Sequence, residues 1–178
     1  MRAEVSAERV REFLGRFGRA ARGPGTVFLT GGATALLLGW RAATIDIDLS
    51  MDPEPRGAFE AIARLKVDLD VNVDIASLAD FIPRLPGWRE RCRFIESVGD
   101  IQFFHYDPSS QALWRLERYH QRDLEDVRQM LRRGLIRTED LLRLLGAIEP
   151  EMLRYPAVDP SEFRRKVEQF VSSAEGAS

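Results

Sequence analysis

The stretch that decides the fold is Phe28–Leu49, which reads FLTGGATALLLGWRAATIDIDL. Its first half places Gly31-Gly32 between a short apolar run and a run of helix-forming residues. Its second half alternates Ile and Leu with Asp46 and Asp48, in the period of two that is typical of a β-strand. The stretch therefore predicts a strand, a glycine turn, a short helix and a second strand that carries two carboxylates.

The flanking sequence adds further elements to this unit. Apolar residues at helical spacing predict helices over 6–19, 33–38 and 57–65, and alternation predicts strands over 26–30, 45–50 and 71–75. Residues 92–97 and 101–106, joined at Gly99-Asp100, predict a β-hairpin, whereas 80–88 reads as irregular. Beyond Pro108 we expect helices at about 109–119, 123–133 and 138–146 and after Pro160, with N-caps at Thr138 and Asp159 and a frayed tail over 172–178.

These elements predict an α+β protein. A sheet flanked by helices occupies residues 1–107, and a helical subdomain packed on this core occupies residues 108–178. The chain has 178 residues, 44% hydrophobic and 30% charged, with a formal net charge of −2. Such a composition is that of a globular protein without a global footprint for nucleic acid.

Composition also excludes several classes of protein. No apolar run is long enough for a membrane span, and the N-terminal residues lack the apolar core of a signal peptide, so we expect a cytoplasmic protein without a membrane partner. The single cysteine, Cys92, excludes an internal disulfide and a cysteine-based zinc site, and is expected in a buried strand. Basic clusters at 84–93 and 115–137 are read as solvated helix faces, with a local phosphate-binding patch as the alternative.

Asp46 and Asp48 are the first candidate site residues. At positions i and i+2 of a strand their side chains project from one face, with Cα atoms roughly 7 Å apart. Two carboxylates so placed repel each other, and a divalent cation such as Mg²⁺ removes that repulsion by binding their oxygens. The alternative is a solvated strand face, where aspartate is disfavoured.

Asp74 is the candidate third carboxylate. It lies in the strand-like run VNVDI, and it would join the first two aspartates if this strand neighbours 45–50. Three carboxylates and a triphosphate can hold two metal ions about 4 Å apart. Asp68 and Asp70 are rivals for this position, and a polar residue on an exposed face is the alternative reading.

The glycine turn is a candidate nucleotide-binding element. Gly31 and Gly32 let backbone N–H groups approach a phosphate, although glycines at turns are common. Arg41 and Thr44 in the loop that follows are expected to reach phosphate or to cap the turn.

Two motifs resemble those of a known superfamily. The run TGGA, followed by DIDL after residues 34–45, resembles the signature of polymerase-β-type nucleotidyltransferases. Residues 111–127, QALWRLERYHQRDLEDV, resemble the C-terminal motif of the AbiEii/MenA-like branch, many members of which are toxins of toxin–antitoxin pairs. The resemblance covers about residues 26–135 and implies a small mixed β-sheet flanked by helices, followed by a helical subdomain.

The resemblance assigns roles to individual residues. Asp46, Asp48 and Asp74 would be catalytic carboxylates that bind Mg²⁺ or Mn²⁺. The nucleotide-binding set would comprise the turn, its loop and three later residues, namely Gly31, Gly32, Arg41, Thr44, Arg115, Asp123 and Asp126. Arg115 stands where the family often has a lysine, and arginine binds phosphate as a planar fork rather than as a point charge.

Other polar and aromatic residues have simpler readings. We favour a helix-capping role for Asp123 and Asp126, with Asp123 at the N-cap of the helix at 123–133. This role is compatible with a role in the site. His105 and His120 are expected to be hydrogen-bonded structural residues. Core packing is expected for Trp88, Phe103 and Phe104.

The function that these features predict is that of a Mg²⁺-dependent nucleotidyltransferase. It would move a nucleoside monophosphate from a nucleoside triphosphate to an acceptor hydroxyl. By resemblance the acceptor would be a tRNA 3′ end or a protein, and the chain would be the toxin partner of a cognate antitoxin. The alternative is a catalytically degenerate nucleotidyltransferase fold that binds a nucleotide or a protein. A third reading is an antitoxin-like module with the helical half as interface.

Overall fold

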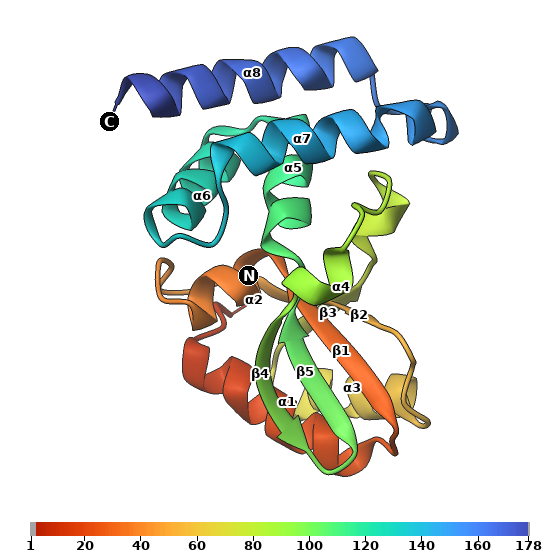
Figure 1. Ribbon diagram of the computed structural model, residues 1–178. Helices are drawn as coiled ribbons and strands as arrows, with labels where there is room; N and C mark the ends of the chain where they lie inside the picture. The colour runs from red at the N-terminus through yellow and green to blue at the C-terminus, as the bar shows by residue number, and fades with distance from the viewer. Residues whose placement is uncertain (1–2, 178) are drawn as a thin grey trace. The chain divides into compact units, whose positions relative to one another are not determined.

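The computed structural model describes residues 3–177 and divides the chain into two compact units (Figure 1). The first unit comprises the chain up to Ser77 and the segment Arg93–Tyr106. The second unit comprises Leu78–Cys92 and the chain from Asp107 onward. The single boundary drawn from the sequence at 107/108 therefore differs from this division, because residues 78–92 belong with the later helices.

The first unit is a sheet with helices, as the sequence predicts. Its elements are α1 (Ala7–Ala20), β1 (Gly25–Thr30), α2 (Gly31–Leu37), β2 (Asp46–Met51), α3 (Ala58–Asp68), β3 (Asn72–Ile75), β4 (Arg93–Val98) and β5 (Ile101–His105). The strand order is β3-β2-β1-β5-β4 among the described residues. The pairs β1–β5 and β2–β3 are parallel and the pairs β1–β2 and β4–β5 antiparallel, so the sheet is mixed.

One face of this sheet carries the core of the first unit. Alternate residues of the central strands, such as Leu29, Ile47 and Phe103, are fully buried. They pack with the apolar sides of α1 and α3, including Phe13 and Leu65. Each such side chain contributes about 1.5–3 kcal/mol through burial. The intervening residues of the strands project from the opposite face, which is the face of the candidate site.

The second unit is helical. Its elements are the 3₁₀ helix η1 (Leu78–Asp80), α4 (Trp88–Arg91), α5 (Pro108–Arg118), α6 (Gln121–Arg132), α7 (Thr138–Ile148), the 3₁₀ helix η2 (Glu149–Arg154) and α8 (Pro160–Gly176). Helix α5 contacts α6, α7 and α8 and so forms the centre of the unit. The short elements η1 and α4 end and begin at Asp80 and Trp88, and residues 81–87 between them are irregular, as the sequence predicted.

The helix ends confirm one expectation and correct two. Asp159 does cap α8, where its Oδ1 accepts a hydrogen bond from the Glu162 backbone N–H at 3.1 Å. Thr138 does not cap α7, because it is already the first helical residue. The expected frayed tail is instead helical as far as Gly176, and buried Phe170 and Val171 anchor that last part of α8; residue 178 lies outside the described part.

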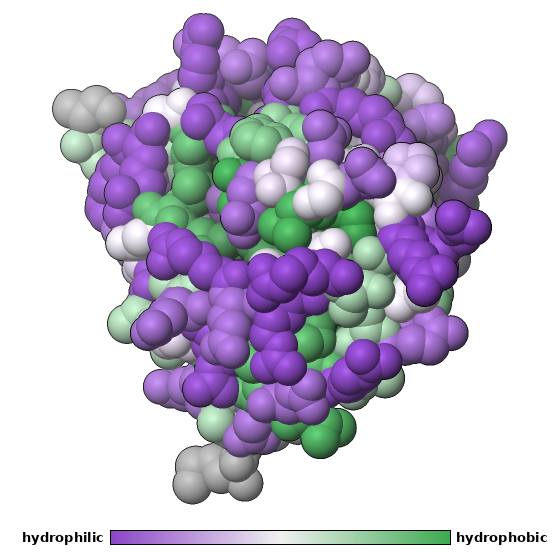
Figure 2. Space-filling model, turned by 90° about the horizontal axis from the view of Figure 1, so that it is seen from below, coloured by the Kyte–Doolittle hydropathy of each residue, from purple (hydrophilic) through white to green (hydrophobic). Residues whose placement is uncertain are grey.

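The surface has the polarity expected of a water-exposed protein. Hydrophilic side chains cover most of the face in Figure 2, and hydrophobic ones show between them. Phe59 on α3 is one of the exposed hydrophobic residues. Within residues 3–177, no helix has the length and apolar character needed to cross a membrane.

Candidate active site

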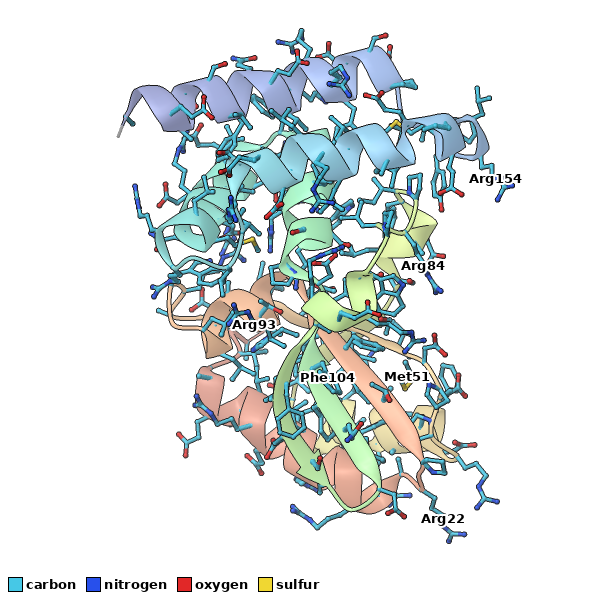
Figure 3. All side chains as sticks on the ribbon, in the orientation of Figure 1. Arg22, Met51, Arg84, Arg93, Phe104 and Arg154 are labelled. Carbon is cyan, nitrogen blue, oxygen red and sulfur yellow. The ribbon has the colours of Figure 1, made fainter. Side chains whose placement is uncertain are left out.

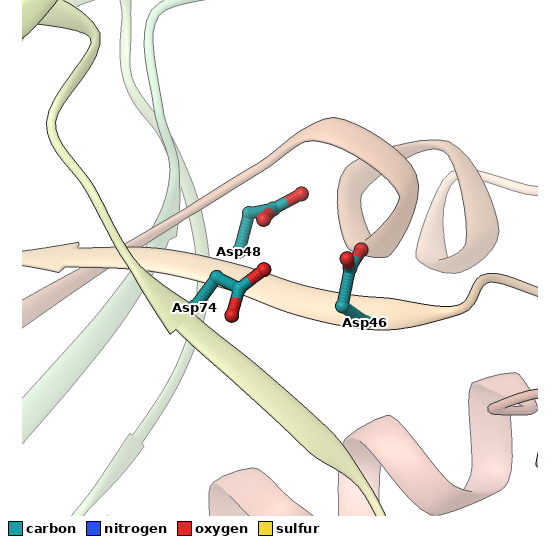
Figure 4. Close-up of side chains that lie close together, drawn as sticks. All are labelled: Asp46, Asp48 and Asp74. Atoms are coloured by element: carbon teal, nitrogen blue, oxygen red, sulfur yellow. The ribbon is translucent and has the colours of Figure 1, made fainter. Parts of the chain in front are cut away.

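Three aspartates converge on one face of the sheet (Figure 4). Asp46 and Asp48 lie on β2, and Asp74 lies on the adjacent strand β3. One carboxylate oxygen from each lies within 4.8 Å of those of the other two. Asp46 and Asp48 are half-buried and Asp74 is exposed, so the group remains open to small ligands.

The register of the sheet explains the convergence. In β2, Ile47 and Leu49 point into the core and are fully buried, so Asp46 and Asp48 project from the other face. Parallel pairing then sets Asp48 directly opposite Asp74. Because like charges in direct opposition destabilise a sheet, this pair has a structural cost that a bound cation would relieve.

Asn72 is a residue of this group that the sequence analysis missed. It lies opposite Asp46 in the register, two positions before Asp74 and therefore on the same face. Its Nδ2 donates a hydrogen bond to Asp74 Oδ1 at 3.3 Å, which orients that carboxylate. The sequence indicates this position through the spacing of two between Asn72 and Asp74, which places both side chains on one face of a strand.

The rival carboxylates lie elsewhere. Asp68 ends α3 and accepts a hydrogen bond from Arg16 Nη2 at 2.8 Å. Asp70 occupies the turn before β3, with φ +49°, and is exposed. Neither belongs to the carboxylate group found among the described residues.

Gly31 lies against Asp48 because Thr30, its predecessor, pairs with Asp48 across β1 and β2. The φ angle of Gly31 is +64°, a conformation that costs other residues about 1–2 kcal/mol. A Cβ atom at Gly31 would lie 2.6 Å from Asp48 Oδ2. Any other residue would place its Cβ atom against this carboxylate, so Asp48 keeps its position only with glycine at residue 31.

Gly32 lies against the two loop residues of the predicted nucleotide-binding set. A Cβ at this position would overlap Thr44 Oγ1 and would lie 3.3 Å from Arg41 Nη1. The Thr44 hydroxyl donates to the Asp46 backbone carbonyl at 3.2 Å, which ties the loop to the start of β2. The structure therefore brings Gly31, Gly32, Arg41 and Thr44 to the side of the carboxylate group.

The donor set fits a hard divalent cation. Mg²⁺ and Mn²⁺ prefer oxygen ligands, and one to three carboxylates with open positions are typical of sites that also bind a triphosphate. The three clustered carboxylate oxygens, with Asp74 exposed, meet that requirement. Asp46, Asp48 and Asp74 are thus the residues that could hold the metal.

The remaining predicted residues, Arg115, Asp123 and Asp126, meet one another in the second unit. Arg115 Nη1 lies 3.2 Å from Asp123 Oδ1 and 2.8 Å from Asp126 Oδ2. All three side chains are at most 4% exposed, and Arg118 donates two further hydrogen bonds to Asp123 at 3.1 Å. This cluster joins α5 to α6 inside the unit.

Asp123 does not cap a helix as the sequence predicted. Helix α6 begins two residues earlier, at Gln121, and His120 occupies the N-cap position without a side-chain hydrogen bond to the backbone. Asp123 is therefore within the first turn, where its negative charge is favourable and its oxygens accept from Arg115 and Arg118.

His105 has the structural role that was expected. It is 4% exposed, and its Nδ1 lies 3.1 Å from Thr34 Oγ1. Burial lowers the pKa of His105 to about 4, so the ring is uncharged at neutral pH. Phe103 belongs to the core, as predicted, whereas Phe104 is half-buried.

Cys92 and Trp88 correct two expectations. Cys92 is a half-buried residue at the C-cap of α4 rather than a buried strand residue, and its thiol donates to the Trp88 carbonyl at 3.3 Å. Burial raises the pKa of Cys92 to about 12, so the thiol stays protonated at neutral pH. Trp88 is half-buried and lies beneath the guanidinium groups of Arg84 and Arg89.

Comparison with known proteins gives one match. The model of a family described as "Nucleotidyltransferase of unknown function (DUF6036)" matches residues 12–173. The search of curated proteins and the search of solved structures each gave no significant match. The matched range includes both Gly31-Gly32 and the three clustered aspartates.

Proposed function

The chain belongs to DUF6036, a family of nucleotidyltransferases of unknown function, and from this premise we propose that it transfers a nucleoside monophosphate from a nucleoside triphosphate to an acceptor hydroxyl. The observation that carries the proposal is the convergence of Asp46, Asp48 and Asp74 within 4.8 Å beside the glycine turn. A site for this reaction needs carboxylates for the metal and a place for the phosphates next to them.

The three aspartates would hold Mg²⁺ or Mn²⁺. A divalent cation bound there supplies charge neutralisation for the triphosphate and lowers the pKa of an oxygen that it binds. Asp48 is the central ligand, because it lies between Asp74 on β3 and Gly31 after β1. Asn72 keeps Asp74 oriented toward the group by donating to its Oδ1.

The residues around Gly32 would bind the phosphates. Gly31 and Gly32 are the first residues of α2, and Arg41 and Thr44 lie at the same turn. An arginine there offers charge and a planar fork of donors for phosphate oxygens. With the metal and these donors in place, catalysis consists largely of positioning and charge stabilisation.

The finer assignment rests on the similarity of residues 111–127 to the AbiEii/MenA-like motif. This similarity supports a toxin role for the chain, with tRNA 3′ ends or a protein as the acceptor and an antitoxin as a partner. In the same proposal Arg115, Asp123 and Asp126 contribute to nucleotide binding from the helical subdomain, and the protein acts in the cytoplasm.

The ion pairs of Arg115 favour a second candidate function. The residue at the family's lysine position is bound by two buried aspartates of its own unit. In that case the chain would be a degenerate nucleotidyltransferase fold that binds a nucleotide or protein without transferring the nucleotide. Calorimetric titration with ATP separates the two functions, because only the enzyme requires the Asp46–Asp48–Asp74 group and a metal for triphosphate binding.

The decisive experiment is a labelling assay with matched variants. The protein is incubated with each α-³²P-labelled nucleoside triphosphate, Mg²⁺, and either total RNA or total protein. Asp48→Asn should reduce label transfer by about 10²–10³-fold, since it removes one charge from the central ligand. Asp70→Asn is the control, because Asp70 is exposed, lies outside the group and has a positive φ that asparagine tolerates. Transfer that persists in Asp48→Asn would refute the site.

A further inference from the structure

A pocket lined by arginines lies in the first unit, at the end of the sheet away from the carboxylate group. Its volume is about 290 Å³, and it lies between the end of α1 and the start of α3. Its lining residue Arg22, labelled in Figure 3, extends into solvent there. Arg22 comes just before β1, which runs from Gly25 to Thr30, the residue that pairs with Asp48. Six residues of strand span about 20 Å, so the pocket and the carboxylate group are separate.

Arg22 and Arg56 lie side by side in this pocket because the backbone pairs them. They form an isolated antiparallel bridge, in which the Arg22 N–H donates to the Arg56 carbonyl at 2.8 Å and the Arg56 N–H donates to the Arg22 carbonyl at 2.9 Å. Directly opposed residues of such a pair place their side chains on one side, with Cβ atoms about 5 Å apart. Two guanidinium groups are thus held next to each other, and a bound anion would relieve their repulsion.

Arg64 adds a third positive charge to the pocket from α3. Glu60, one helical turn earlier, also lines it, so three arginines and one glutamate give the lining a formal charge of +2. Within residues 3–177 these four exposed side chains form no ion pair and no side-chain hydrogen bond. Exposed Arg165, by contrast, pairs with Glu162 one turn away. The charges of the pocket are therefore available to a ligand.

We propose that this pocket binds a phosphate group. Guanidinium groups bind phosphate oxygens through paired charge-assisted hydrogen bonds, and Arg22, Arg56 and Arg64 would contact the phosphate from different sides. Among the described residues that line the pocket none is aromatic, so the lining recognises the anion rather than a base. The phosphate belongs to a free anion such as pyrophosphate or to the backbone of a single-stranded RNA. The site goes beyond the proposed transfer reaction, because it uses neither the three aspartates nor the glycine turn.

The test is an NMR titration of the full chain with pyrophosphate in the presence of EDTA. Without metal the three aspartates repel the anion, which disfavours binding at the candidate active site. The backbone ¹H–¹⁵N resonance of Gly57, a lining residue, should therefore shift, and that of Asp48 should not.

A second titration, with a short oligouridine that lacks a terminal phosphate, tests the RNA backbone as the source of the phosphate. A Gly57 shift with pyrophosphate supports a site for free anions, and a shift with the oligouridine alone supports a backbone site. A Gly57 resonance unchanged by both ligands at millimolar concentration would overturn the proposal.

Matched variants connect the binding to the arginines. Arg22→Gln and Arg56→Gln should each weaken binding about tenfold, because each removes a charge-assisted hydrogen bond. Glu60→Gln should tighten it about two- to fivefold, since it removes a negative charge from the lining. Arg11→Gln is the control, because Arg11 is an exposed residue of α1 outside the pocket. Affinities of Arg22→Gln and Arg56→Gln equal to that of Arg11→Gln would refute the phosphate site.

The carboxylate group provides the last control. Asp48→Asn should leave the metal-free response of Gly57 unchanged, whatever it does to label transfer. Loss of that response in Asp48→Asn would show that the anion occupies the candidate active site, and would overturn the arginine site without refuting the transfer reaction.

Discussion

Replacement of Gly31 by alanine tests the contact between the glycine turn and the carboxylate group. The new methyl would lie 2.6 Å from Asp48 Oδ2, and φ at this position is +64°. The backbone conformation costs alanine about 1–2 kcal/mol. The clash adds little to that figure, because the nearest atom is the end of a side chain that can rotate away. Rotation, however, removes Asp48 from the other two carboxylates.

The expected result is therefore a separation of stability from metal binding. Gly31→Ala should lose about 1–2 kcal/mol of unfolding free energy in urea. Its affinity for Mn²⁺, measured by calorimetry or by EPR of the free ion, should fall on the order of 10–100-fold, the range found when a ligand loses its orientation. Both measurements use the full chain.

Gly57→Ala is the matched control. Gly57 has a similar φ of +74°, and a Cβ there meets nothing within 4 Å. It should show the same loss of stability and no loss of Mn²⁺ affinity. If Gly31→Ala binds Mn²⁺ as tightly as Gly57→Ala does, the argument that glycine preserves the Asp48 position is wrong.

Three further predictions concern buried ionisable groups. Arg115→Met should destabilise the protein by about 3–5 kcal/mol in urea unfolding, because it removes the buried cation that Asp123 and Asp126 share, whereas exposed Arg132→Met should change stability by less than about 0.5 kcal/mol. Cys92, whose pKa is raised to about 12 by burial, should react with iodoacetamide at pH 8 far more slowly in the folded protein than in urea. Burial lowers the pKa of His105 to about 4, so the unfolded chain binds its proton first and stability should fall as pH drops from about 6.5 to 4, a slope that His105→Phe should reduce. An unchanged slope in that variant, rapid alkylation of the folded protein, or a stable Arg115→Met would each contradict the corresponding argument.

Part of the carboxylate site could be predicted from the sequence. The period-two alternation of Asp46 and Asp48 with buried Ile47 and Leu49 is a local pattern, and the structure confirms the strand that it predicts. The position of Asp74 depends on which strand pairs with β2 and in which register. No local pattern determines that pairing. The sequence therefore predicts Asp74 as the third carboxylate only if the two strands are assumed to be neighbours.

The helical half shows why local signals fail. Asp123 has the spacing of a capping residue, yet α6 begins at Gln121 and Asp123 binds Arg115, eight positions earlier on α5. Cys92 follows an apparently irregular segment and precedes a strand, but a short helix ends there. In both cases the boundary of the helix differs from the one that the residue types predict.

The chain passes between the two compact units three times, after Ser77, after Cys92 and after Tyr106. Neither unit is a continuous stretch, so a truncation at residue 107 keeps 78–92 but removes every helix with which this segment belongs. Proteolytic or genetic dissection by single cuts would therefore damage both halves at once. To obtain the sheet alone, one would end the chain after Tyr106 and replace Leu78–Cys92 with a linker long enough to cross the sheet, because β3 and β4 are its opposite edges. Such a minimal chain would keep all three aspartates and the glycine turn, and would show directly whether they bind metal without the helical unit.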